Sequence, residues 1–149
     1  MSGSIVVGVD GSDASQEALR WAVEEARLRS APLVAVHAWS FVPPQPIGDP
    51  GMLAMPAGDL PGQLSAESEA ARIALDSAVE GVLGADAEIE RKLVEGDAGE
   101  ALVAESSSAQ LVVVGSHGRS GFKAALLGSV SRHVTNHAAC PVVVVKTSG

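Results

Sequence analysis

A cluster of glycine and serine residues directly behind an apolar run is the part of this sequence best suited to binding a ligand. Gly115 and Gly118 follow the run at residues 110–114, and Gly128-Ser129 comes after a further nine residues. Glycine lets the backbone approach a ligand closely, and a helix that begins near Ser129 would leave its first N–H groups unpaired. This pattern predicts a cradle for an anion, most often a phosphate group.

The distribution of charge favours the same prediction. All 18 acidic residues lie at or before Glu105, whereas residues 106–149 hold four basic residues and no acidic one. The glycine cluster thus lies in the acid-free part of a chain whose formal net charge is −8. Nucleic acid or an anionic membrane would require a basic face, so we expect neither as a partner.

The length of 149 residues suits a single domain that spans residues 1–149. Cys140 is the only cysteine, which excludes an internal disulfide, and the apolar runs are too short to cross a bilayer. Because no stretch reads as a secretory leader, we expect a cytoplasmic location.

Apolar runs and helical periodicity alternate along the chain. Strands are predicted at residues 4–9, 33–38, 87–94, 110–114 and 141–146, and helices at residues 13–29, 65–83, 97–107 and 129–138. Residues 39–62 are rich in Pro and Gly, and we expect a long loop or lid there. In the first helix, Asp13 and Gln16 are spaced like a capping box, and Trp21 is expected to be a packing residue.

Strands joined by helices predict an α/β fold, with one open, mainly parallel five-stranded sheet and helices on both faces. In such sheets, ligands lie beyond the carboxyl ends of the strands where the winding direction reverses. A reversal between the first and fourth strands would place Asp10 opposite the glycine cluster. If the last strand lies at the sheet edge, its free N–H and C=O groups invite pairing with a second copy of the chain.

Several polar side chains also have purely structural interpretations. An Asp directly after a strand commonly forms an Asx-turn or caps a helix, although the position of Asp10 opposite the glycine cluster favours a functional role. His133 and His137 stand one helical turn apart, but no companion carboxylate or cysteine set accompanies them. We therefore predict ordinary packing for these histidines and no metal site. Cys140 is expected to be a small buried apolar residue.

The spacing of the glycine cluster, Gly-x2-Gly-x9-Gly-Ser, differs from the P-loop and from Gly-x-Gly-x-x-Gly. It resembles the ATP-binding signature of the universal stress protein family. Further segments similar to that family are Val-Asp-Gly-Ser at 9–12, His37, Glu-Gly-Asp at 95–97 and Cys-Pro-Val-Val-Val-Val-Lys at 140–146. The resemblance covers nearly the whole chain and implies a Rossmann-like fold of the adenine nucleotide alpha hydrolase type. It also implies a homodimer through the fifth strand.

The resemblance further implies which residues bind ATP, with or without Mg²⁺. Val9 would flank the base, Asp10 would contact the ribose or the adenine side, and the Ala38 backbone would bind the adenine edge. The residues implied to face the phosphates are Gly115, Gly118, Arg119, Gly128, Ser129 and Val130.

No catalytic constellation stands out, because Ser129 lacks an identifiable base and no carboxylate pair can be placed around the phosphates. The sequence therefore favours a nucleotide-binding regulatory module over an enzyme, and the family resemblance implies a role in the stress response. A slow ATPase or phosphotransferase is one alternative, in which Asp10 would hold a metal and His117 would assist. A cyclic AMP-binding module is another, because the cradle recognises phosphate generically.

Overall fold

Five parallel strands form one sheet in the order β3-β2-β1-β4-β5. They are β1 (Ser4–Gly8), β2 (Leu33–Trp39), β3 (Glu90–Glu95), β4 (Ala109–Gly115) and β5 (Val142–Val145). The coordinates are a computed structural model that describes residues 3–41, 60–118 and 127–147. The winding direction reverses between β1 and β4, which is the condition for Asp10 to lie opposite the glycine cluster, and β3 and β5 are the edge strands.

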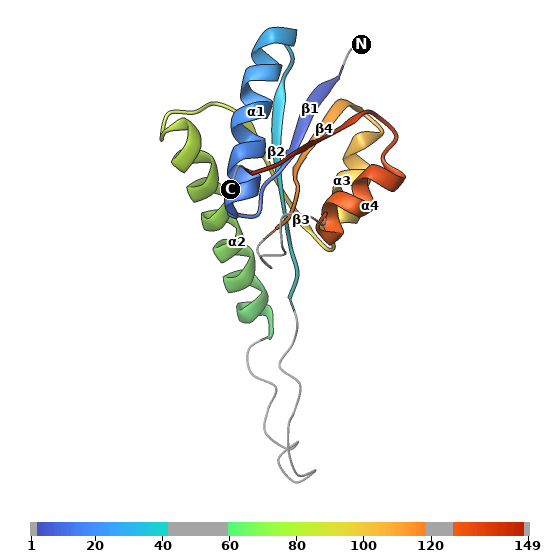
Figure 1. The fold of residues 1–149 in the computed structure, drawn as a ribbon. Helices are drawn as coiled ribbons and strands as arrows, with labels where there is room; N and C mark the ends of the chain where they lie inside the picture. Colours follow the sequence, from blue (N-terminus) through green and yellow to red (C-terminus); the bar gives the residue numbers. More distant parts are fainter. Residues whose placement is uncertain (1–2, 42–59, 119–126, 148–149) are drawn as a thin grey trace.

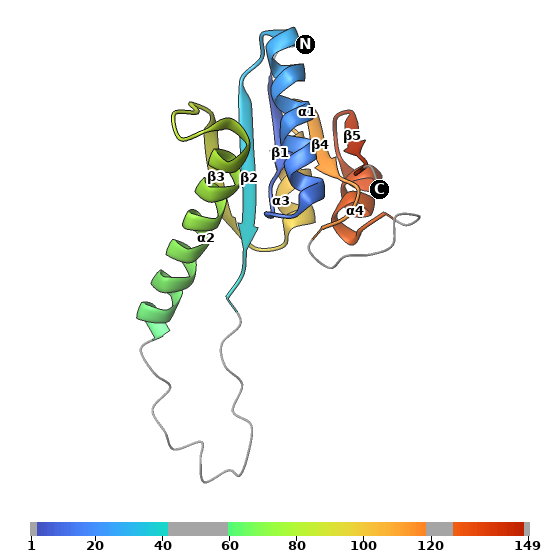
Figure 2. The ribbon, with the colours of Figure 1, turned by 60° about the vertical axis from the view of Figure 1, so that its left-hand side comes forward.

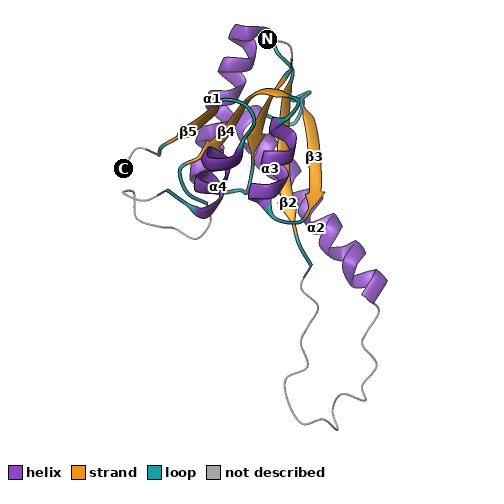
Figure 3. Cartoon of the chain, turned by 90° about the vertical axis from the view of Figure 1, so that its right-hand side faces the viewer, coloured by secondary structure: helices purple, strands orange, loops and turns teal. Residues whose placement is uncertain are grey.

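The described helices cover the two faces of this sheet in pairs (Figures 1 and 2). One pair is α1 (Asp13–Arg29) with α2 (Leu60–Leu83), and the other is α3 (Ala98–Ser106) with α4 (Ser129–His137). Figure 3 shows α3 and α4 side by side in front of the sheet, between the two edge strands. The predicted α/β fold is thereby confirmed. Among the described helices, none is long and apolar enough to cross a membrane.

The core consists of two apolar layers, one on each side of the sheet. Because successive strand residues point to opposite faces, Ile5 and Val7 pack with α1 and α2, whereas Val6 packs with α3 and α4. On the helix side, Leu19 of α1 and Leu102 of α3 are almost completely buried. The central strands are thus buried on both faces, which explains their continuous apolar sequence.

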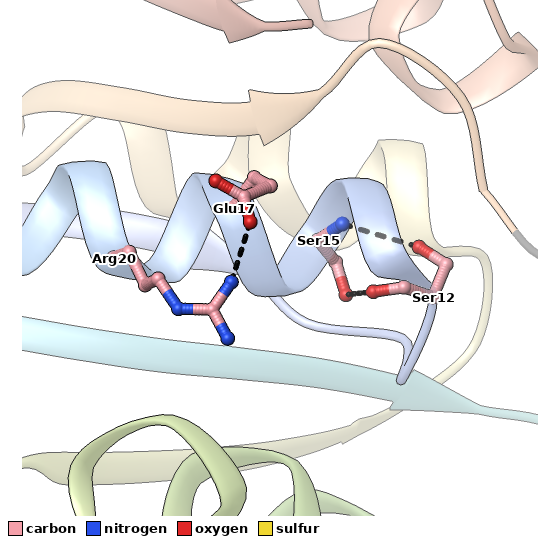
Figure 4. Close-up of polar contacts among 4 residues, drawn as sticks. All are labelled: Ser12, Ser15, Glu17 and Arg20. Carbon is pink, nitrogen blue, oxygen red and sulfur yellow. Dashed lines mark hydrogen bonds and ion pairs between the residues drawn. The ribbon is translucent and has the colours of Figure 1, made fainter. Parts of the chain in front are cut away.

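The start of α1 differs from the predicted capping box at Asp13 and Gln16 (Figure 4). Ser12 takes the N-cap position instead, with its Oγ accepting a hydrogen bond from the Ser15 N–H at 3.2 Å. The Ser15 hydroxyl donates back to the Ser12 carbonyl at 3.1 Å. The predicted box was wrong because Asp13 is already the first helical residue, and the extended residue before a helix is the one that caps it.

Two element boundaries differ from the sequence predictions by three residues or more, and the others by at most one residue. α2 begins at Leu60 rather than at residue 65. Proline is tolerated in the first turn of a helix, because an N–H group there would have no intrahelical acceptor, and Pro61 therefore does not prevent this earlier start. Together with the extension of β2 to Trp39, this shortens the predicted loop at 39–62, whose residues 42–59 lie outside the described ranges. β3 begins at Glu90 rather than at residue 87, because its pairing starts at Val34, near the beginning of β2.

Trp21, predicted to be a packing residue, lies on α1 with 36% of its surface exposed. The contacts of α1 with the sheet are made by small residues such as Ala18 and Ala22, which are completely buried. Small side chains let the helix approach the sheet closely, so the large indole remains at the edge of the contact.

Candidate functional site

A cavity of about 310 Å³ lies at the carboxyl ends of β1, β2 and β4, beside the first turns of α3 and α4. Its lining comes from three parts of the chain: β1 to α1, the second half of β2 together with α3, and β4 to α4. The lining residues are Gly8, Val9, Asp10, Ser15, Val36, His37, Ala38, Ala98, Leu102, Val114, Gly115, His117, Gly118, Gly128, Ser129, Val130 and Ser131.

The structure brings eight of the nine binding residues expected from the sequence around this one cavity. They are Val9, Asp10, Ala38, Gly115, Gly118, Gly128, Ser129 and Val130. The ninth, Arg119, lies outside the described residues. Segments more than a hundred residues apart in sequence therefore meet at the topological reversal between β1 and β4.

Asp10 is held in the cavity wall by the turn that precedes α1. Its Oδ1 accepts a hydrogen bond from the Ser12 N–H at 2.8 Å, and its own N–H donates to the Ser15 hydroxyl at 3.3 Å. This is the Asx-turn that a structural interpretation of Asp10 predicts. The turn does not use the second oxygen, Oδ2, which lies 2.7 Å from the position that a Cβ of Gly118 would take. Asp10 thus combines its structural role with a carboxylate oxygen directed at Gly118 in the connection from β4 to α4, which we call the glycine loop.

His37 closes the opposite side of the β1 end. Its Nδ1 lies 2.7 Å from the Val9 carbonyl oxygen, and because a carbonyl only accepts, Nδ1 carries the hydrogen. The Val9 N–H in turn donates to the Val36 carbonyl at 2.9 Å. These two bonds fix the peptide groups of Val9 beside β2.

The backbone of Ala38 is turned toward the cavity by the alternation of β2. The Val36 carbonyl faces β1, and the Trp39 carbonyl faces β3, where it accepts from the Gly96 N–H at 2.8 Å. Because backbone groups alternate in direction along a strand, the N–H and C=O of Ala38 face the β1 side. There they lie beyond Gly8, the last residue of β1. One donor and one acceptor thus stand next to each other at this wall.

An apolar wall between β2 and α3 was missed by the sequence predictions. Val36, Ala98 and Leu102 line the cavity there, and Leu102 is 2% exposed. A Cβ added to Gly8 would lie 2.9 Å from Cδ1 of Leu102, so the glycine leaves room for this leucine. The apolar pattern of α3 indicates a buried face, but nothing in it tells which residues border a cavity.

The start of α4 differs from the starts of α1 and α3. Ser12 and Asp97 cap those two helices with side-chain hydrogen bonds, whereas Gly128 at the N-cap of α4 makes none. The first N–H groups of any helix lack intrahelical acceptors. In α4 these are the N–H groups of Ser129 and Val130, two residues that line the cavity. The positive end of the helix dipole lies there and favours an anion.

The described lining carries little charge. Asp10 is its single carboxylate, and neither lysine nor arginine belongs to it. Within residues 3–41, 60–118 and 127–147, no three His, Cys, Asp or Glu side chains are grouped to hold a metal ion. On α4, the rings of His133 and His137 stack at a centroid distance of 4.5 Å. The backbone N–H groups of α4, rather than basic side chains, are thus the described groups that favour an anion here.

Comparison with protein families gives one match that covers nearly the whole chain. The model of the universal stress protein family matches residues 1–146. Universal stress protein Rv2005c of Mycobacterium tuberculosis is 40% identical over 147 residues, which are 97% of this chain and 45% of that protein. Rv2623 of the same organism is 38% identical over 144 residues, again with 45% of its length covered. This chain therefore spans about half the length of these curated relatives.

Solved structures of similar proteins have the same fold. Universal stress protein UspA from Lactobacillus plantarum has a TM-score of 0.69 at 25% identity, over 97% of this chain and 99% of that one. A universal stress protein from Archaeoglobus fulgidus in complex with dAMP has a TM-score of 0.60 at 30% identity, with 97% and 98% covered. A universal stress protein in complex with cAMP has a TM-score of 0.57 at 30% identity, with 99% and 100% covered. From the family match over residues 1–146, this chain belongs to the universal stress protein family.

Proposed function

We propose that this protein binds an adenine nucleotide, with ATP as the first candidate, and acts as a regulatory protein of the stress response. The observation that carries the proposal is the pairing of two features in one cavity. The uncapped start of α4 suits phosphate, and the outward backbone groups of Ala38 suit the edge of a purine base.

The phosphate end is assigned to the start of α4. The backbone N–H groups of Gly128, Ser129 and Val130 belong to a helix start, so their arrangement costs little to preorganise. However, the Gly128 N–H already donates to the Ser116 carbonyl at 2.7 Å. Ser129 and Val130 therefore supply the free backbone donors, and the Ser129 hydroxyl adds a third. Asp10 would repel a phosphate, so the triphosphate extends away from its carboxylate.

The base end is assigned to β2. Adenine presents the acceptor N1 next to the N6 amino donor, and the adjacent N–H and C=O of Ala38 complement this pair. Guanine presents the opposite order along the same edge, so the arrangement discriminates against GTP. The apolar side chains of Val9, Val36 and Leu102 offer surfaces on which the ring can stack. The ribose would then lie near Asp10, whose Oδ2 accepts a hydroxyl hydrogen.

The complexes of related proteins with cAMP and dAMP support an adenine nucleotide but leave the number of phosphates open. Cyclic AMP is the alternative ligand, and it would use the same base contacts with fewer phosphate contacts. A slow ATPase or phosphotransferase is the alternative activity. Asp10 is the described carboxylate that could share Mg²⁺ with phosphate oxygens, and one carboxylate is enough for such a site.

We also propose a homodimer through β5. The Pro141 carbonyl accepts a hydrogen bond from Val112 of β4, and the Val145 carbonyl accepts one from Ser116, directly after β4. Alternation therefore turns the backbone groups of Val142 and Val144 to the open edge. β5 consists of four valines without a charge, whereas the β3 edge carries exposed Glu90 and Lys92. An uncharged edge accepts another strand, and charges on an edge oppose it. The partner proposed is a second copy of the chain.

The function is tested by titration calorimetry of the purified protein with ATP, AMP, cyclic AMP and GTP. We expect ATP to bind and GTP to bind at least about tenfold more weakly, because guanine mismatches the Ala38 pair. No binding of any adenine nucleotide would contradict the proposal. Phosphate release by the wild type and by Asp10→Ala then separates a binding protein from a slow ATPase. Release that requires Asp10 would favour the enzyme.

A further inference from the structure

Ser131 is a buried serine in the first turn of α4 that ties the two ends of the glycine loop together. Its side chain is 1% exposed, and its hydroxyl lies 3.0 Å from the Ser116 carbonyl oxygen and 3.0 Å from the Gly128 carbonyl oxygen. A hydroxyl has one hydrogen, so the two carbonyls share it. Ser116 directly follows β4, and Gly128 directly precedes α4. The hydroxyl therefore spans the loop at its base.

The Ser116 peptide is the fixed point of this arrangement. Its N–H donates to the Val145 carbonyl of β5 at 2.9 Å, which anchors it to the sheet. Its carbonyl accepts both the Ser131 hydroxyl and the Gly128 N–H, the latter at 2.7 Å. The start of α4 is thus held against the end of β4 by two hydrogen bonds to a single oxygen.

We propose that Ser131 is a positioning residue for the phosphate cradle. This inference rests on the proposed nucleotide site and adds a residue that acts through the loop. Glycine-rich backbone loses much conformational freedom when it is ordered around a ligand. A buried hydrogen bond that holds Gly128 in place before binding removes part of that entropic cost, which raises affinity for the phosphate-bearing part of the ligand.

Replacing the hydroxyl leaves no buried carbonyl without a donor. In Ser131→Ala, the Ser116 carbonyl keeps the Gly128 N–H, and the Gly128 carbonyl keeps the Arg132 N–H at 3.0 Å. The fold is therefore expected to survive. The substitution removes only the hydrogen bonds from the Ser131 hydroxyl to these two carbonyls, which we call the clamp. Ser131→Cys retains a side chain of similar size with a weaker donor, and it replaces the alanine variant should that variant not fold.

Ser106 offers a matched control. It is also 1% exposed, and its hydroxyl donates to the Val103 carbonyl and accepts from the Ala139 N–H at 2.9 Å. It thus bridges two segments as Ser131 does, but it does not line the cavity. Ser106→Ala should lower the melting temperature without changing affinity for a nucleotide.

The experiment compares ATP with adenosine as calorimetric ligands for the wild type, Ser131→Ala and Ser106→Ala. We expect Ser131→Ala to lower the affinity for ATP about three- to tenfold and the affinity for adenosine less than about twofold. Ser106→Ala should leave both affinities unchanged. Ser131→Thr, which retains the hydroxyl, should recover most of the ATP affinity. Unchanged ATP affinity in Ser131→Ala, or equal losses for ATP and adenosine, would overturn the positioning role.

Amide hydrogen exchange of Gly128 without any nucleotide separates this inference from the proposed function. If the wild type binds no adenine nucleotide, the proposed function fails, and the clamp is judged by exchange alone. Faster exchange at Gly128 in Ser131→Ala than in the wild type supports the clamp. An unchanged exchange rate overturns it, whichever ligand the cavity binds.

Discussion

A Cβ atom at Gly118 would lie 2.7 Å from Oδ2 of Asp10, so the glycine loop meets the turn after β1 with no room for a side chain. Gly118 is not among the glycines with positive φ, which means that space rather than backbone conformation requires glycine here. The other carboxylate oxygen of Asp10 is already bound to the Ser12 N–H. The two residues therefore set the width of the cavity between β1 and the loop.

Gly118→Ala should consequently displace the Asp10 carboxylate and lower the affinity for ATP. Loss of one hydrogen bond to the ligand corresponds to about 0.5–1.5 kcal/mol, or roughly two- to tenfold in affinity. The control is Gly81→Ala on α2, where an added Cβ meets nothing within 4 Å. Calorimetry should show weaker ATP binding for the first variant only. Equal affinities in two folded variants would mean that Asp10 does not contact the nucleotide.

Gly128 allows a test of charge at the phosphate end. Its φ of −68° is ordinary, so a side chain there causes no backbone strain, but an added Cβ would lie 3.0 Å from Cα of His117. Gly128→Ala and Gly128→Asp share this contact and differ in the carboxylate. Repulsion between that carboxylate and phosphate should make the Asp variant bind ATP at least about tenfold more weakly than the Ala variant.

Circular dichroism and a melting curve must accompany these titrations. The shared contact with His117 lowers the stability of both variants, whereas aspartate at an N-cap raises the stability of the Asp variant relative to Ala by about 1 kcal/mol. Binding and stability are thus expected to change in opposite directions between the two. Identical ATP affinities for the Ala and Asp variants would contradict the assignment of the phosphate groups to the start of α4.

The proposed homodimer predicts different outcomes for proline substitutions at two neighbouring positions of β5. The N–H of Val144 faces the open edge, so Val144→Pro removes a donor that only a partner strand would use. The N–H of Val143 faces β4, so Val143→Pro breaks the sheet and lowers the melting temperature. Sedimentation velocity should show a dimer for the wild type and a folded monomer for Val144→Pro. A monomeric wild type, or a dimer that persists in Val144→Pro, would contradict pairing through β5.

Cys140 is expected to react slowly with alkylating reagents. It is half-buried beside the apolar layer on the α3 and α4 side, and this burial raises the pKa of its thiol above the ordinary value despite an opposing hydrogen bond with the Val112 backbone. A raised pKa means less thiolate near neutral pH, and thiolate is the reactive form. Mass spectrometry should show slower labelling of the folded protein than of the urea-unfolded chain at pH 8. Equal rates would indicate an exposed thiol.

The sequence predicted most of what depends on local pattern. β1, β4 and β5 are continuous apolar runs, and strands of this kind lie in covered parallel sheets. The meeting of Asp10 with the glycine loop followed from topology, because the carboxyl ends of parallel strands share one edge. These features need no knowledge of distant side chains.

Features that depend on distant partners could not be predicted in the same way. The beginning of β3 is determined by where β2 offers a partner, and the sequence around residue 87 does not contain that information. Leu102 borders the cavity because Gly8 leaves room for it, a contact between residues far apart in sequence. Ser131 reads as an ordinary helix serine until the Ser116 carbonyl is seen beside it.

Backbone amide chemical shifts measured during an ATP titration test the central claim most directly. The proposed geometry predicts that the largest changes occur at Ala38 and at Ser129 and Val130, since these N–H groups would bind the base and the phosphates. Adenosine should cause the same chemical-shift change at Ala38 as ATP. It should cause little change at Ser129 and Val130, because it carries no phosphate. Absence of shifts with saturating ATP, or shifts confined to residues away from this cavity, would contradict the assignment of the cavity as an adenine-nucleotide site.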